Sequence, residues 1–118
     1  MKLLQERLTS SSLIDLRKHN PETCEEVEAA DGVIRVWRDR PPEACVKSDR
    51  FREWFKTTSQ QQLVVQRLTQ AGALDVNEKR GLSTRQCHLP LLKEKPSCFV
   101  IRLHEFEKLA AAKIKVSL

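Results

Sequence analysis

Glycine is scarce in this chain, and the catalytic motifs that depend on it are missing. Only three glycines occur among 118 residues, and none belongs to a phosphate-binding loop or to a G-x-S-x-G turn. The zinc-protease sequence H-E-x-x-H is absent too. Cys87 and His88 are adjacent, but on a strand they would point to opposite faces and could not act as a nucleophile and its base. The sequence therefore predicts no catalytic centre and no enzyme.

Long apolar runs are also missing. No stretch of about 20 apolar residues could span a bilayer. The opening segment 1–16 carries Lys2, Glu6, Arg7 and Asp15, so it lacks the apolar core of a signal peptide. We therefore expect a cytoplasmic protein that has no membrane partner.

Closely spaced cysteines are missing as well. The four cysteines lie far apart, at Cys24, Cys45, Cys87 and Cys98. Without an export signal, such spacing favours reduced, buried thiols over disulfides. Cys87, His88, Cys98 and His104 have the atoms that zinc prefers, but no Cys-x-x-Cys or His-x-x-x-His pair brings them together. We expect no metal site and no cofactor.

The chain does contain enough apolar residues for one core. Apolar residues make up 40% and charged residues 31%, as in a single globular domain. The net charge of +5 comes entirely from the second half, since residues 1–59 hold eleven cations and eleven carboxylates, whereas residues 60–118 hold ten and five. A basic half suits a polyanionic partner, although ordinary solubility explains it equally well.

The first half of the chain predicts helices and a hairpin. Residues 1–18 show helical spacing, followed by either a second turn or a short extended piece. Asn20 and Pro21 are a plausible N-cap and first position of a short helix that ends at Asp31-Gly32. Residues 33–37 and 44–47 flank a proline turn, so we expect a β-hairpin.

A helix should follow the hairpin. Ser48 can cap it, and Phe51, Trp54 and Phe55 then lie on one face at i, i+3 and i+4. These rings could stack on nucleic-acid bases, but a small domain needs their area in its core. We therefore expect them to be buried.

A second helix follows a short break. Ser59 and Gln62 have the spacing of a capping box, and Gly72 suits the helix C-terminus. Its inward side should consist of Leu63, Val64, Leu68 and Ala71. Two helices joined by a turn of about three residues form a helix-turn-helix unit.

Two further strands should form a wing. Residues 85–89 and 97–103 alternate in polarity and are joined by a basic loop, 90–96. Residues 104–115 predict a closing helix whose apolar side carries Phe106, Leu109 and Ala110. The complete pattern predicts one α+β winged-helix domain over 1–118, with an N-terminal helical segment (1–30), a winged-helix core (31–103) and a C-terminal helix (104–118).

The second helix of this unit has the most distinctive surface. Gln62, Gln66 and Gln70 repeat every four residues and should form an exposed stripe, with Arg67 beside it. No carboxylate occurs between Lys56 and Leu74. Glutamine can contact base edges or phosphates, and arginine can hold a phosphate. The alternative is a solvated face of good helix formers.

The wing region adds cations to this picture. They are Lys79, Arg80 and Arg85 near one end of the wing and Lys93 and Lys95 in its loop. Such residues could reach phosphates beside a groove that a helix occupies. Glu78 and Glu94 weaken the patch, and solvated loop charge is an equally good explanation.

Five short segments resemble a known pattern. They are Asp31-Gly32-Val33, Phe51-Arg52-Glu53-Trp54-Phe55, Val65 to Leu74, Ser83-Thr84-Arg85-Gln86 and Cys98-Phe99-Val100-Ile101-Arg102. The pattern is similar to the C-terminal region of helicase or primase-like ATPases of prophages, plasmids and integrating elements. The resemblance implies a winged helix without the ATPase motor, which positions DNA or regulates the motor.

The sequence thus predicts a module that binds duplex or forked DNA, mainly through phosphates and with little sequence preference. A protein-docking winged helix, bound to a partner or to a parent ATPase, is the alternative. It would need an exposed apolar patch, for example from Leu63 and Val65.

Overall fold

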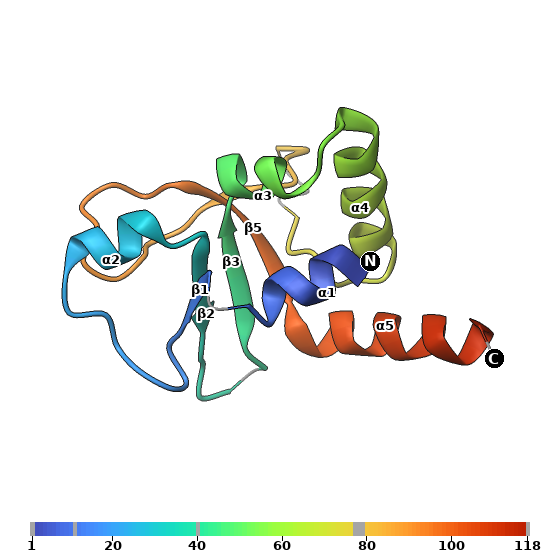
Figure 1. Ribbon diagram of the computed structural model, residues 1–118, viewed down its shortest axis with the longest axis horizontal. Helices are drawn as coiled ribbons and strands as arrows, with labels where there is room; N and C mark the ends of the chain where they lie inside the picture. Colours follow the sequence, from blue (N-terminus) through green and yellow to red (C-terminus); the bar gives the residue numbers. More distant parts are fainter. Residues whose placement is uncertain (1, 11, 40, 77–79, 118) are drawn as a thin grey trace.

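The computed structural model describes residues 2–10, 12–39, 41–76 and 80–117, and it shows a small mixed α+β domain (Figure 1). Five strands form one sheet in the order β1-β2-β3-β5-β4. The strands are β1 Leu13–Asp15, β2 Gly32–Arg35, β3 Glu43–Lys47, β4 Arg85–Gln86 and β5 Ser97–Arg102. The helices are α1 Lys2–Leu8, α2 Cys24–Ala29, α3 Ser48–Trp54, α4 Thr58–Gln70 and α5 Leu103–Ser117.

The predicted hairpin is confirmed and forms the centre of the sheet. β2 and β3 pair antiparallel, with Val33 opposite Cys45. β3 pairs along its whole length with β5, also antiparallel. The extended piece expected after the first helix is β1, which adds to β2 in parallel at the sheet edge. The N-terminal segment therefore contributes a strand as well as helices.

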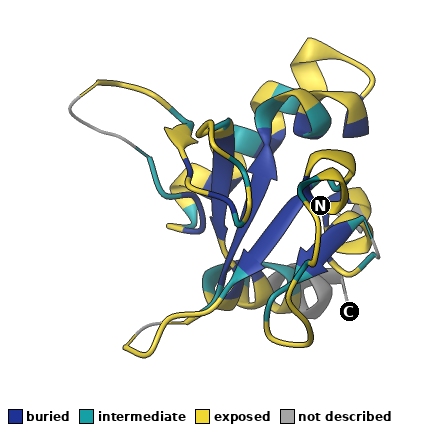
Figure 2. Ribbon diagram, turned by 90° about the vertical axis from the view of Figure 1, so that its left-hand side faces the viewer, coloured by how far each residue is buried: buried dark blue, intermediate teal, exposed yellow. Residues whose placement is uncertain are grey.

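The sheet separates two apolar clusters. One face, which we call the aromatic face, packs against α1, α3, α4 and the start of α5, and Phe51 and Phe99 meet on it with ring centroids 4.3 Å apart. The other face, the thiol face, packs Cys45 and Cys98 against α2 and the segment after β4. Figure 2 shows the buried strands enclosed by more exposed helices and loops. Because strand side chains alternate, β1, β2, β3 and β5 each contribute to both clusters.

The helix boundaries correct two predicted caps. α2 begins after Thr23, whose side chain accepts a hydrogen bond from the Glu26 backbone N–H at 3.3 Å, so Asn20 is not its N-cap. α3 has Lys47 at its N-cap position without a side-chain cap bond, so the prediction for Ser48 was also wrong. Lys47 ends a paired strand, and the chain enters α3 directly from the sheet.

The cap of α4 lies two residues earlier than predicted. Thr57 has extended backbone dihedral angles, and its side chain accepts a bond from the Gln60 N–H at 3.1 Å. Ser59 lies inside the first turn, so it cannot act as an N-cap. The predicted end is confirmed, since Gly72 follows the helix with φ of +70°.

The strands of the predicted wing are present, but β4 is shorter than expected. It pairs with β5 through Arg85 and Gln86 only. Another short stretch reaches β5 earlier, where Leu74 lies opposite Ile101. The segment between Leu74 and Arg85, which we call the excursion, joins two stretches that pair with β5 at different points along its length.

The closing helix is confirmed, although it begins at Leu103. Phe106 is buried in the aromatic-face cluster, and Leu109 packs against that cluster. Within the described residues, no helix combines the length and apolarity needed to cross a membrane.

Candidate nucleic-acid interface

α4 is held against the sheet by side chains on one side only. Val64 and Leu68 are buried in the aromatic-face cluster, and Val65 packs against its edge. The Gln61 side-chain amide donates to the backbone carbonyls of Arg52 at 3.1 Å and Phe55 at 3.2 Å. Because these carbonyls lie at the end of α3, Gln61 ties α4 to α3.

The opposite side of α4 faces solvent. Gln62, Gln66, Gln70 and Arg67 are all exposed, as predicted. Leu63 was predicted to point inward, but 47% of its surface is exposed. At 100° per residue, Leu63 falls between Gln70 and Arg67, whereas Gln61 points to the core side and bonds α3 there. Leu63 is therefore part of the exposed stripe.

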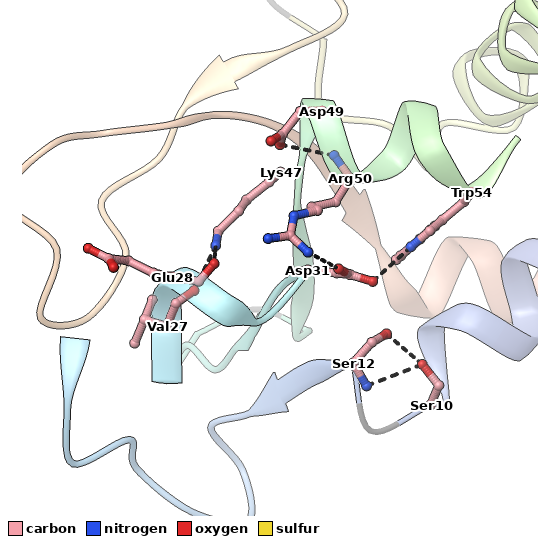
Figure 3. A network of polar contacts seen from close by, with 9 residues as sticks. All are labelled: Ser10, Ser12, Val27, Glu28, Asp31, Lys47, Asp49, Arg50 and Trp54. Atoms are coloured by element: carbon pink, nitrogen blue, oxygen red, sulfur yellow. Dashed lines mark hydrogen bonds and ion pairs between the residues drawn. The ribbon is translucent and has the colours of Figure 1, made fainter. Parts of the chain in front are cut away.

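α3 is fixed beside the sheet by a partly buried polar network (Figure 3). The Asp31 carboxylate accepts a hydrogen bond from the Trp54 indole N–H at 2.8 Å and forms an ion pair with Arg50 at 3.4 Å. Beside it, the Lys47 ammonium donates to the Val27 carbonyl at 2.7 Å and to the Glu28 carbonyl at 2.9 Å.

Those two carbonyls belong to the last turn of α2, so Lys47 caps that helix. Burial lowers the pKa of Lys47. Through this network, the sheet determines where α3 lies, and α3 in turn positions α4.

Two arginines frame the C-terminal end of α4. Arg102 donates to the Gly72 carbonyl, just after the helix, and lies 3.5 Å from the Asp75 carboxylate. Arg85 pairs with the same carboxylate at 3.2 Å and bonds the Val76 carbonyl at 3.1 Å. The Arg85 side chain remains 42% exposed, and the Arg102 side chain remains 46% exposed. Asp75 thus holds two cations next to the exposed stripe without covering them.

The N-terminal end of α4 is also basic. Arg52 in α3 and Lys56 in the turn are exposed, and Gln61 connects this turn to the helix. Glu53 is the exposed carboxylate nearby in sequence. We define the α4 surface as the exposed stripe with the cations on it and at its C-terminal end: Leu63, Gln62, Gln66, Gln70, Arg67, Arg85 and Arg102.

The predicted wing loop lies elsewhere. Lys93 and Lys95 are exposed on the loop 87–96. This loop and α2 line a shared depression of about 640 Å³, and Leu89 packs in the same cluster as Val27 of α2. Figure 1 shows α4 at the right of the molecule and the loop beside α2 at the left. The structure therefore does not bring these two lysines onto the α4 surface.

Two further predicted cations, Lys79 and Arg80, lie in the sequence between α4 and the loop 87–96. Arg80 is exposed in the excursion between Leu74 and Arg85. Lys79 lies outside the described residues.

The thiol face contains an unusual cluster. Cys45, Cys87 and Cys98 are buried and free, as predicted, whereas Cys24 is only partly buried. The Cys87 thiol and burial raise the pKa of Cys45 and of Cys98, and hydrogen bonds from these two thiols lower the pKa of Cys87. Among the described residues, no group of three or more His, Cys, Asp or Glu side chains has an arrangement that could hold a metal ion.

Sequence reasoning missed Arg102 as a member of the α4 surface, and it placed Leu63 inward except in the docking alternative. The inward placement came from grouping Leu63 with the apolar residues next to it. A helical projection centred on Val64 and Leu68 places Gln61 on the inward side and Leu63 outside it. No local sequence pattern indicates the place of Arg102, because it lies beside Gly72 only through the pairing of β5 with the segment after α4.

No protein-family model, curated protein or solved structure matches this chain in the comparisons made.

Proposed function

We propose that this protein is a winged-helix module that binds duplex DNA by inserting α4 into the major groove. The chain order β3, α3, α4, β4, β5 and the sheet order β3-β5-β4 support this assignment. A winged helix has the same arrangement, in which the strand before the helix pair joins the last strand of the wing. α1, which contacts α3, takes the place of the first helix.

One observation carries the proposal: the exposed side of α4 has no carboxylate and has cations along one side and at its C-terminal end. The stripe offers amides of Gln62, Gln66 and Gln70 as donors and acceptors. Arg67 lies along its side, and Arg85 and Arg102 stand at its end. Cations that flank a groove-sized helix can hold phosphates on both sides of it.

The fold determines which part of the protein would contact the duplex. α4 has thirteen residues, and Arg102 of β5 donates a hydrogen bond to the Gly72 carbonyl just after its end. An α-helix fits the major groove, and its exposed side chains then reach base edges. Lys93 and Lys95 lie beyond this contact, so any DNA contact they make is with a different stretch of the duplex.

The wider setting we propose is an accessory role in a mobile-element replication or helicase protein. The resemblance to the ends of helicase and primase-like ATPases supports it. The described part of the chain shows no motif for nucleotide hydrolysis. The module would then position duplex or forked DNA for a separate motor.

The test is fluorescence anisotropy of labelled duplex, forked and single-stranded DNA at several salt concentrations. We expect binding whose log affinity falls linearly with log salt, and duplex or fork preferred over the single strand. Absence of binding at the lowest salt would contradict the proposal.

A second candidate is protein docking through α4. Its support is the exposure of Leu63, an apolar residue within the stripe. The predicted patch of Leu63 and Val65 does not form, because Val65 projects to the other side of the helix and packs against the core. Buried apolar anchors with a polar rim are typical of protein interfaces. If DNA does not bind, the same surface should be tested by size-exclusion analysis with candidate partner ATPases.

A further inference from the structure

The α4 surface presents one apolar side chain among glutamines. Leu63, Gln66 and Gln70 project within an arc of about 60°, since consecutive residues turn by 100°. Arg67 lies at the edge of this arc, about 40° beyond Leu63. Leu63 stands on the N-terminal half of α4, the half that reaches deepest toward base edges in helix-turn-helix contacts.

Exposing the apolar side chain of Leu63 to water is unfavourable in free energy. A ligand that covers this side chain would remove that penalty. Nearly half of its surface is in water, although Gln61 beside it occupies a core-side position. A single exposed leucine is common on protein surfaces, so the inference depends on where Leu63 stands, which is on the α4 surface beside glutamines. The surrounding surface is polar and basic, with Gln70 and Arg67 nearest to Leu63 in projection and Gln66 next, so the fitting ligand is a polyanion with a small apolar group.

Double-stranded DNA presents one such group in its major groove. An A·T pair presents the thymine C5-methyl and the adenine N6 and N7 in the major groove, and glutamine can contact that adenine edge with two hydrogen bonds. A leucine and a glutamine three residues apart on a helix are neighbours. In the major groove, a thymine methyl and the adenine edge of the adjacent base pair are neighbours too.

We propose that α4 reads A·T base pairs, with Leu63 against a thymine methyl and Gln66 on an adjacent adenine. This inference rests on the proposed DNA binding and adds a base preference to it. Phosphate contacts from Arg67, Arg85 and Arg102 would still supply most of the affinity, so the preference is a modest addition to a salt-dependent interaction.

The test uses three labelled duplexes of equal length in anisotropy titrations at one salt concentration. One is A·T-rich, the second has the same sequence with deoxyuridine in place of thymidine, and the third is G·C-rich. The second lacks only the methyl groups. We expect the wild-type protein to bind the uridine duplex about fourfold more weakly for each methyl that Leu63 covers, the loss expected for one buried methyl group.

Two variants make the result specific. Leu63→Ala should bind the thymidine and uridine duplexes equally, and circular dichroism should show an unchanged fold because the side chain is exposed. Leu82→Ala is the matched control, since Leu82 is also 47% exposed but lies in the excursion after Leu74. It should keep the wild-type discrimination.

The outcomes separate the two claims. If wild type binds all duplexes but does not distinguish thymidine from uridine, the base-reading inference is wrong and DNA binding stands. If Leu63→Ala discriminates as wild type does, the inference is also overturned. If no duplex binds, the proposed function itself fails.

Discussion

The two faces of the sheet differ in how firmly they hold what packs on them. On the aromatic face, Phe51 contacts Trp54, Phe55 and Phe99, with ring centroids 6.1, 5.0 and 4.3 Å apart. The thiol face has a smaller cluster that contains three cysteines and is covered by the six-residue α2 and a loop. Aromatic side chains bury more area and pack in defined pairs. α4 therefore rests on the stronger face and the loop 87–96 on the weaker one.

This difference assigns different roles to the two basic regions. A helix that reads a groove must be held in a fixed orientation. α4 meets that requirement through Val64, Leu68 and Gln61. Lys93 and Lys95 are exposed on a loop without regular secondary structure, so these cations are suited to adjustable phosphate contacts.

The largest expected effect tests how much packing on each face of the sheet contributes to the free energy of unfolding. Phe51→Ala should lower the free energy of unfolding by about 3–5 kcal/mol, because a fully buried ring with three aromatic neighbours is lost. Leu89→Ala on the thiol face should cost about 2 kcal/mol, since the adjoining loop can close over the cavity. Urea denaturation measures both. Equal losses would remove the distinction between the faces.

The next effect concerns the two basic regions directly. Arg67→Glu should weaken duplex binding about tenfold and reduce the salt slope by about one or more, because a phosphate contact becomes a repulsion. The double variant Lys93→Glu/Lys95→Glu should weaken binding less, although it reverses two charges. A larger loss from the double variant would place the interface on the loop.

A smaller effect tests how α4 is tied to α3. Gln61→Ala removes hydrogen bonds to the carbonyls of Arg52 and Phe55 and should cost about 1–2 kcal/mol of unfolding free energy. Gln62→Ala is the matched control on the next residue, and its exposed side chain should leave stability within about 0.5 kcal/mol of wild type. Thermal and urea unfolding of both variants would show whether the amide bonds matter; equal stability would mean that they do not.

The smallest effect tests the start of α4. Thr57→Ala should cost about 1 kcal/mol, because its side chain caps the Gln60 N–H. Ser59→Ala should be close to neutral, since Ser59 lies inside the helix. The opposite ranking would restore the cap that the sequence predicted.

Much of the fold could be predicted from local sequence. The apolar spacing of Phe51, Trp54 and Phe55 and the alternation around Phe99 depend on the period of helix and strand, and both groups are buried as expected. Cap positions were harder to predict, because Thr57, Thr58 and Ser59 offer three hydroxyls and the backbone dihedral angles decide which one caps.

The candidate site was only partly predictable. The exposed glutamines follow from helical periodicity, but the meeting of Arg85, Arg102 and Asp75 depends on strand pairing between distant segments. The place of the loop 87–96 depends on its packing against α2, more than fifty residues earlier in the chain. Such long-range contacts leave no periodic pattern in the sequence.

The most direct test of the central claim is a titration of isotope-labelled protein with a short duplex, followed by amide chemical shifts. The account predicts that the largest shifts occur at Gln62, Leu63, Gln66 and Gln70, with smaller ones near Arg85 and Arg102. Shifts confined to α2 and the loop 87–96, or no shifts at low salt, would contradict it.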